Sequence, residues 1–255
     1  MSEAMLLTVS MSSHNEEEAL PITIPPLVDH LNKLGVAYEV VLVDNGSTDG
    51  TAEVIDGFTA RGLPVRRVDV PVNRGYGLGM WTGVQAARGD VVCMAWSDGQ
   101  VSSEDVAKVC GQSLNLQRGE MVKVRRVTRY DGLLRRFISK TYNILFTMLF
   151  GRVTPDVNGC PKILRREDWA LLDMQSLDSF ADAEIMIKVA RLKFKITEVP
   201  VVFLARKQGG TKVRLIGHIL MFLGDLIKFR VTRILPRWDK WRAARQARQV
   251  EGEVA

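Results

Sequence analysis

The chain has 255 residues, enough for one substantial core, and its 46% hydrophobic and 25% charged residues are ordinary for a globular protein. The net charge of +6 favours anionic partners such as nucleotides, phosphates or an acidic membrane surface, and without a base-reading motif we expect no nucleic-acid partner. The three cysteines exclude a disulfide framework. No apolar run reaches the roughly 18 residues that span a bilayer, and the N-terminus does not resemble a signal peptide, so we expect a cytoplasmic location.

Strand-like and helix-like runs alternate through the first hundred residues. Strands are predicted at Met5–Ser10, Glu39–Val43, Val65–Val70 and Asp90–Ala95, and helices at Pro25–Leu34, Thr51–Arg61 and Gly77–Arg88. This alternation indicates βαβ units and a mainly parallel central sheet of the α/β class. Ligands of such sheets bind at the carboxyl ends of the strands, which is where the polar motifs of this chain fall.

The rest of the chain is more basic. Helices are predicted at Arg135–Phe150 and Asp182–Leu192, and Thr197–Leu204 is predicted to be an edge strand because it contains Pro200. A longer helix, Val213–Leu235, carries one narrow polar stripe on an apolar surface and ends at Pro236. A basic tail with two tryptophans follows it.

The first polar motif is the loop Asp44–Thr51, directly after a predicted strand. Asp44 and Asn45 have oxygens that can accept hydrogen bonds from a base or ribose, and Gly46 allows a sharp backbone turn. The same residues also suit a plain strand-to-helix loop with an N-cap. Both interpretations stay open at this point.

A second motif, Asn73–Gly79, leads into a predicted helix. Asn73 and Gly75 lie where a helix N-terminus can receive a diphosphate. The motif follows the third strand rather than the first and lacks the full spacing of a dinucleotide fingerprint.

The third motif, Trp96–Gln100, ends a predicted strand. Asp98 and Gln100 offer a carboxylate and a carbonyl oxygen, which are ligands that Mg²⁺ and Mn²⁺ prefer. A loop aspartate that caps the next helix is the alternative.

The order of the motifs identifies a family. Val9–Leu20, Val41–Thr51, Asn73–Asp90, Ser97–Gln100 and Arg206–Lys212 together resemble the inverting nucleotide-diphospho-sugar glycosyltransferases, of the dolichol-phosphate (polyprenyl-phosphate) mannosyltransferase kind. The resemblance implies a Rossmann-like nucleotide-sugar domain over residues 1–212, with residues 213–255 as an amphipathic helix and basic tail that contact a membrane surface or a partner.

Individual residues match the family's motifs. The resemblance implies that Glu16 and Asp44 contact the donor nucleotide, that Asp98 and Gln100 hold the divalent metal, and that Arg206 contacts the donor phosphates. Arg126, Arg135 and Ser139 look similar to residues that hold a lipid phosphate. The departures are Trp96, where the family has the first metal-motif aspartate, and Ser12 and His14, where it has proline and tyrosine before the Asn-Glu pair. Losing one carboxylate is expected to weaken metal binding.

The acceptor decides whether a base is needed. A phosphate acceptor is already ionised near neutral pH, and the basic run Lys123–Arg136 suits it because guanidinium groups bind phosphate bidentately. A hydroxyl acceptor requires a base, for which Asp182 and Glu184 are the candidates. These acids also suit a purely structural role at a helix N-terminus.

The amphipathic helices favour a lipid acceptor, because broad apolar faces with basic residues suit the membrane interface. Packing on the core, on a partner subunit or in a homo-oligomer is the alternative. The sequence therefore predicts an inverting glycosyltransferase, peripheral on the cytosolic face of a membrane, that uses a polyprenyl-phosphate acceptor. A transferase for saccharide hydroxyls and a degenerate nucleotide-binding scaffold without turnover remain as alternatives.

Overall fold

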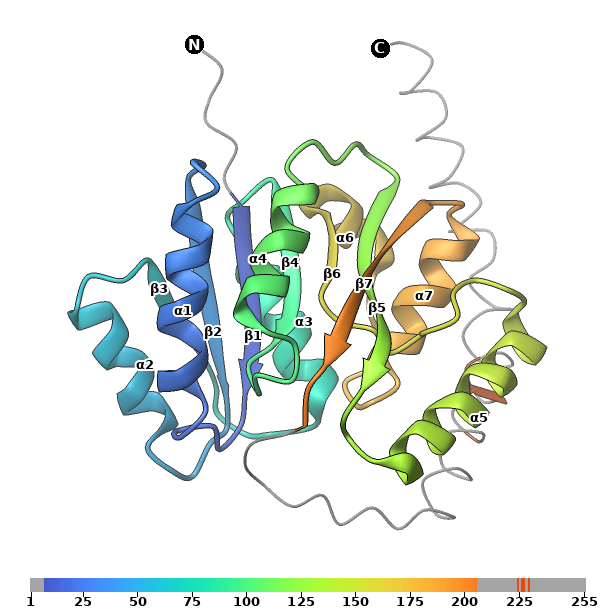
Figure 1. Ribbon diagram of the computed structural model, residues 1–255, viewed down its shortest axis with the longest axis horizontal. Helices are drawn as coiled ribbons and strands as arrows, with labels where there is room; N and C mark the ends of the chain where they lie inside the picture. The colour runs from blue at the N-terminus through green and yellow to red at the C-terminus, as the bar shows by residue number, and fades with distance from the viewer. Residues whose placement is uncertain (1–6, 206–223, 225, 228, 230–255) are drawn as a thin grey trace.

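The computed structural model describes residues 7–205 together with residues 224, 226, 227 and 229. Its centre is a seven-stranded sheet with the order β3-β2-β1-β4-β6-β5-β7 (Figure 1). The strands are β1 (Leu7–Ser13), β2 (Tyr38–Asn45), β3 (Val65–Val70), β4 (Val91–Trp96), β5 (Glu120–Arg129), β6 (Lys162–Arg165) and β7 (Lys195–Phe203). The helices are α1 (Leu20–Asn32), α2 (Thr51–Ala60), α3 (Tyr76–Ala86), α4 (Ser103–Gln112), α5 (Leu133–Phe150), α6 (Arg166–Leu172) and α7 (Ala181–Arg191).

All strands except β6 run in the same direction. β1 pairs in parallel with β2 and β4, β2 with β3, and β5 with β7, while β6 lies antiparallel between β4 and β5. The predicted mainly parallel sheet is confirmed, and β7 is the predicted edge strand. The carboxyl ends of six strands therefore meet along one edge of the sheet, the lower edge in Figure 1.

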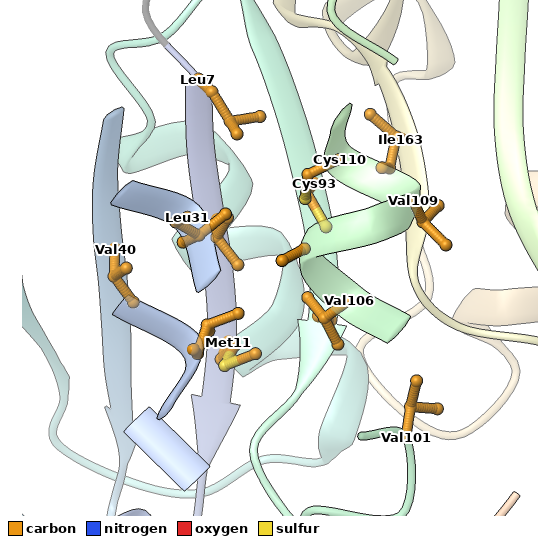
Figure 2. Packing of buried hydrophobic residues seen from close by; sticks show 14 of the residues in the cluster. Leu7, Met11, Leu31, Val40, Cys93, Val101, Val106, Val109, Cys110 and Ile163 are labelled. Atoms are coloured by element: carbon orange, nitrogen blue, oxygen red, sulfur yellow. The ribbon is translucent and has the colours of Figure 1, made fainter. Parts of the chain in front are cut away.

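Helices cover both faces of the sheet. One core joins α1, α2 and α4 to one face, with Leu31, Cys93 and Val106 among its buried side chains (Figure 2). A second core joins α3, α6 and α7 to the other face and includes Met94, Trp169 and Ile185. Neighbouring residues of β4 thus alternate between the two cores, which explains why this strand is apolar on both faces.

The first helix begins earlier than the sequence indicated. The expected helix Pro25–Leu34 began at Pro25, whereas α1 starts at Leu20. Pro25 and Pro26 therefore both lie inside the observed helix. A proline in a helix interior removes one backbone hydrogen bond. Here the buried side chains Leu20, Ile24 and Leu27 recur at helical spacing against the sheet, so tertiary packing outweighs that cost.

The basic segment after residue 120 also differs from the expectation. Residues 120–129 form strand β5, and its Lys123 is completely buried rather than exposed for phosphate binding. Its Nζ donates to the carbonyl oxygens of Asp156 at 2.7 Å and Val124 at 2.9 Å. Burial, followed by the charge of Lys162, lowers the pKa of Lys123 to about 8. Lys123 is therefore a structural residue beneath the site.

Most of the predicted C-terminal helix, its tail, the boundary after residue 212 and Arg206 lie outside the described residues. Of the positions between 213 and 235 that are described, Leu226 and Phe229 are buried in the second core, and the Phe229 ring lies 5.0 Å from that of Phe180. Within the described part of the chain, no helix combines the length and apolarity needed to cross a membrane.

Candidate active site

A cavity of about 630 Å³ lies at the carboxyl edge of the sheet. One side, which we call the carboxylate side, comes from the ends of β1, β2 and β4 and the segments that follow them; it comprises Ser12, Glu16, Asn45, Asp98 and Gln100. The other, the arginine side, comes from the end of β5 and from α5 and comprises Arg126, Arg129, Arg135 and Ser139. The fold thus brings motifs that are far apart in the sequence to one pocket.

The loops after β1 and β2 brace each other on the carboxylate side. The backbone N–H of Thr48 donates to the side chain of Asn15 at 2.9 Å, and that of Gly50 donates to Glu17 at 2.7 Å. In the reverse direction, the Glu16 N–H donates to the Thr51 hydroxyl at 2.9 Å. These backbone bonds fix Glu16 at the pocket.

Several predicted donor residues shape the pocket without lining it. Asp44 accepts the N–H of Ser47 at 2.9 Å and caps its own loop. Gly46 has a φ of +68°, and an added Cβ would lie 2.7 Å from the backbone nitrogen of Asn73, so only glycine allows the two loops to approach. Asp44, Gly46 and Gly75 are absent from the pocket lining, whereas Asn73 and Ser12 are part of it.

The N-terminus of α3, where the sequence suggested a diphosphate, is packed against a protein loop. The N–H of Leu78, in the first turn of this helix, donates to the carbonyl oxygen of Leu177 at 2.9 Å. The loop around Leu177 lies so close that a Cβ at Gly75 would come within 2.4 Å of the same oxygen. This loop therefore covers part of the first turn of α3, and the carbonyl oxygen of Gly75 accepts the side-chain N–H of Asn45 at 3.2 Å.

Asp98 and Gln100 both line the pocket. The Gln100 backbone N–H donates to Asp98 Oδ1 at 3.1 Å, and its side-chain amide donates to the Leu204 carbonyl oxygen at 3.1 Å. Among the described residues, no group of three or more His, Cys, Asp or Glu side chains forms a metal site. A cation held by one or two carboxylates and completed by substrate phosphates still fits this donor set, because that is how Mg²⁺ usually binds.

Trp96 stands in place of the family's first metal-motif acid. It is held by Tyr76, Phe203 and the Arg126 guanidinium, which lies 5.8 Å from the centre of its ring. Its indole N–H donates to the Tyr76 hydroxyl at 2.5 Å, and its ring meets Phe203 edge-on at 5.8 Å. Tyr76 is in turn hydrogen-bonded to Asp182, and burial followed by that negative charge raises the pKa of Tyr76 well above its ordinary value. The phenol therefore stays protonated and links the ends of β4 and α7.

The two predicted acids of α7 have different surroundings. Asp182 lines the pocket and forms a buried ion pair with Lys162. Glu184 does not line it; its fully buried carboxylate accepts the N–H groups of Gln175 at 3.0 Å and Ser176 at 2.6 Å. Glu184 therefore holds the preceding loop, and we do not retain it as a candidate base.

Buried ion pairs also support the arginine side. Arg126 donates to Asp156 through Nε at 2.9 Å and Nη2 at 2.6 Å, and its guanidinium lies 5.0 Å from the centre of the Phe203 ring. Burial alone would raise the pKa of Asp156, but Arg126 and then Lys123 lower it to about 2. Arg129 is paired with Asp131 at 2.6 Å.

Some site residues could not be found from the sequence. Lys162 and Asp156 carry no motif signal, because their roles depend on pairing across the fold. Asn158 carries no motif signal either, and it lines the pocket together with the predicted Asn45. Among the described residues, neither side-chain carbonyl oxygen has a hydrogen-bond partner, and both are buried. Buried acceptors of this kind suit a ligand that brings donors, such as hydroxyl groups.

Residues 8–171 match the sequence profile of glycosyl transferase family 2. The chain belongs to that family. The family predicted from the order of the motifs is therefore confirmed.

Two curated relatives show how this family 2 member compares with known enzymes. It is 32% identical over 157 residues to an undecaprenyl-phosphate 4-deoxy-4-formamido-L-arabinose transferase from Pectobacterium atrosepticum, covering 60% of this chain but only 46% of the relative. It is 26% identical over 253 residues to a dolichyl-phosphate beta-glucosyltransferase from Trichomonas vaginalis, covering 92% of this chain and 76% of that protein. The chain thus spans less than half of the first relative.

Solved structures confirm the predicted fold. Glucosyl-3-phosphoglycerate synthase from Mycobacterium tuberculosis, in complex with Mn²⁺, uridine-diphosphate-glucose and phosphoglyceric acid, superposes with a TM-score of 0.64 at 21% identity. The match covers 89% of this family 2 chain and 79% of the synthase. A Mg²⁺ complex of the same enzyme with uridine diphosphate has a TM-score of 0.62.

Proposed function

We propose that this family 2 glycosyltransferase moves a sugar from a nucleotide-diphosphate donor to a polyprenyl-phosphate lipid, with inversion at the sugar. The observation that carries the proposal is the single pocket in which Asp98 and Glu16 face Arg126, Arg135 and Ser139. Both curated relatives described above are named for lipid-phosphate acceptors, which supports the same acceptor class.

The carboxylate side suits the donor. Ser12, Glu16, Asn45 and Asn73 line it, with Asp44, Gly46 and Gly75 shaping the loops around them. The unpartnered carbonyl oxygens of Asn45 and Asn158 would accept hydrogen bonds from sugar or ribose hydroxyls. Asp98, with Gln100, would hold Mg²⁺ or Mn²⁺, which supplies positive charge against the departing diphosphate. Arg206 keeps its proposed role at the donor phosphates, outside the described residues.

The arginine side suits the acceptor phosphate. Arg135 and Ser139 lie four residues apart on α5 and both reach the pocket, so one helix face presents a guanidinium and a hydroxyl. Arg126, held rigidly by Asp156, adds a second charge. An ionised phosphate oxygen attacks the sugar in line with the leaving group without a base, so the chain's task is positioning.

A hydroxyl acceptor is the second candidate, because Asp182 lines the pocket as a possible base. Its engagement by Lys162 and Tyr76 favours a structural role and weakens this candidate. A third possibility, a scaffold without turnover, predicts neither transfer nor donor hydrolysis. We further propose that the protein acts at the cytosolic face of a membrane; a partner subunit or homo-oligomer stays a prediction.

The test incubates the purified chain with radiolabelled nucleotide sugars, Mg²⁺ or Mn²⁺, and either a short-chain polyprenyl phosphate or free saccharides in detergent. Transfer to the polyprenyl phosphate, and not to saccharides, is expected. Transfer to saccharides alone would establish the hydroxyl-acceptor enzyme. Donor binding without hydrolysis or transfer, over a full donor panel, would establish the scaffold.

A further inference from the structure

Exposed apolar side chains gather on one part of the molecule. Seven large ones lie between the end of β5 and the last turn of α5, with exposed fractions from 48% to 79%: Val127, Tyr130, Leu133, Leu134, Phe137, Ile144 and Met148. The other large exposed hydrophobics in the described part of the chain, such as Ile22 and Val72, are scattered. Single exposed apolar residues are normal, whereas a cluster marks an interaction site.

A basic groove runs through the same region. A cavity of about 970 Å³ between β5 and α5 is lined by the exposed residues Arg125, Arg136, Lys140 and Arg152. None of the four forms an ion pair within the described residues, and Asp156, the one acid among the described residues that line the groove, is bound to Arg126. The groove is therefore an uncompensated cationic surface. We call these four residues and the seven apolar ones the docking face.

Helix α5 carries both the exposed basic and the exposed apolar side chains. Arg136, Lys140, Ile144 and Met148 follow one another at intervals of four residues, so they lie along one side of the helix. Tyr142 and Phe146 are buried in the core and fix the helix from its opposite side. In Figure 1, α5 lies at the lower margin of the molecule, at the same edge as the strand ends that form the pocket.

Charge decides what covers this face. A second copy that docked through the same face would oppose basic residues to basic residues. The chain's own tail is also unsuitable, because its charged residues after Pro236 are mostly arginine and lysine. An anionic bilayer complements both properties, since the phosphates of its lipids meet the cations while its acyl region receives the apolar side chains.

We propose that the docking face seats the enzyme on an anionic bilayer, with the basic groove taking phospholipid headgroups. The groove shares Arg126, Arg129 and Ser139 with the candidate active site, so it adjoins the proposed acceptor position, whereas Arg136 and Lys140 line the groove alone. When the protein docks in this way, the mouth of the pocket faces the lipid surface, where a polyprenyl phosphate presents its headgroup. The inference deepens the proposed function, but vesicle binding is measured without donor or acceptor, so the two can fail separately.

The test is flotation of the full chain with phosphatidylcholine vesicles, with and without phosphatidylglycerol. Arg136→Glu/Lys140→Glu is compared with the matched variant Lys33→Glu/Lys108→Glu, whose lysines are exposed on α4 and at the end of α1. Each pair lowers the net charge from +6 by 4, to +2. The α5 pair is expected to weaken binding to the anionic vesicles at least about 25-fold, because each basic residue near such a surface contributes about fivefold. The control pair should change it about twofold or less.

A second comparison tests the apolar part. Phe137→Ser is expected to weaken vesicle binding about tenfold at both low and high salt. Ile22 has a similar exposure but lies outside the docking face, so Ile22→Ser should leave vesicle binding unchanged. Equal binding by the two charge-reversal pairs, or equal binding of the parent to neutral and anionic vesicles, would overturn the proposal. Transfer to a detergent-dispersed acceptor reports independently on the fold and the proposed function of each variant.

Discussion

On the carboxylate side of the pocket, adjacent loops brace one another through backbone N–H groups, whereas the arginine side rests on ion pairs buried beneath it. The first arrangement joins segments that each follow a strand, as in the bond from Thr48 to Asn15. The second joins β6 to α7 through Lys162–Asp182 and β5 to the segment before β6 through Arg126–Asp156. The carboxylate side can therefore lose a ligand contact with little effect on folding, while the arginine side combines binding and stability in the same residues.

The largest expected effect comes from breaking a buried pair. Lys162→Met leaves the carboxylate of Asp182 buried without its cation and is expected to lower the free energy of unfolding by about 3–5 kcal/mol. The control, Lys195→Met, removes a pair with Glu120 in which the lysine is 76% exposed, and should cost less than about 1 kcal/mol. Urea unfolding measures both. Similar losses in the two variants would show that the buried pair does not support the site.

On the carboxylate side, Asp98→Ala is expected to reduce sugar transfer about 100-fold or more without changing urea unfolding. It removes the carboxylate of the proposed metal loop, and metal stabilisation of a leaving group contributes several kcal/mol. Glu104→Ala, an exposed acid of the following helix, is the control. Metal-dependent donor binding that is equal in Asp98→Ala and the parent would mean that the metal lies elsewhere.

Acid should weaken the arginine side through Asp156. Its pKa is about 2 in the folded protein, below the ordinary value of 3.8, so the unfolded chain binds more protons between these values. The contribution is present above about pH 4 and is lost as the pH falls toward 2, by about 2 kcal/mol. Asp156→Asn should flatten this part of the stability profile. An unchanged slope in the variant would contradict the assignment.

The smallest effect is expected at Trp96. Trp96→Asp restores the family's first metal-motif acid and should tighten Mn²⁺ binding about tenfold, measured by calorimetry with the donor nucleotide present. Trp96→Asn removes the same ring without adding charge and separates the carboxylate from the loss of the contact with Phe203. Equal metal affinity in both variants would show that this position does not face the metal.

The difference between the two sides also explains what the sequence could predict. Glu16, Asn45 and Asp98 lie in short motifs at strand ends, so the α/β alternation placed them correctly at one edge. The structural roles of Lys123 and Glu184 depend on burial. Lys123 lies beside β6, an antiparallel strand of four residues that has no distinct sequence signal, and Glu184 is enclosed by the loop at Gln175 and Ser176. A lysine that anchors a carboxylate in the core looks the same in sequence as one that binds phosphate in solvent.

Glycines gave partial information for a similar reason. The motif Asn73–Gly79 suggested a helix N-terminus that can receive a diphosphate, and in the structure the loop at Leu177 lies against Gly75 and Leu78 of this motif. Glycine indicates that space is tight; it does not identify what fills that space.

A comparison of the steady-state kinetics of Arg135 and Arg136 variants tests most directly whether the pocket has separate donor and acceptor sides. Arg135 lines the pocket, whereas Arg136 lines only the outer groove. With a short-chain polyprenyl phosphate in detergent, Arg135→Ala is expected to raise the acceptor KM about 10- to 100-fold, as for loss of a charge-assisted phosphate contact, while donor affinity stays unchanged. Arg136→Ala should leave both values at those of the parent. Loss of donor affinity in Arg135→Ala, with an unchanged acceptor KM, would contradict the division of the pocket into a donor and an acceptor side.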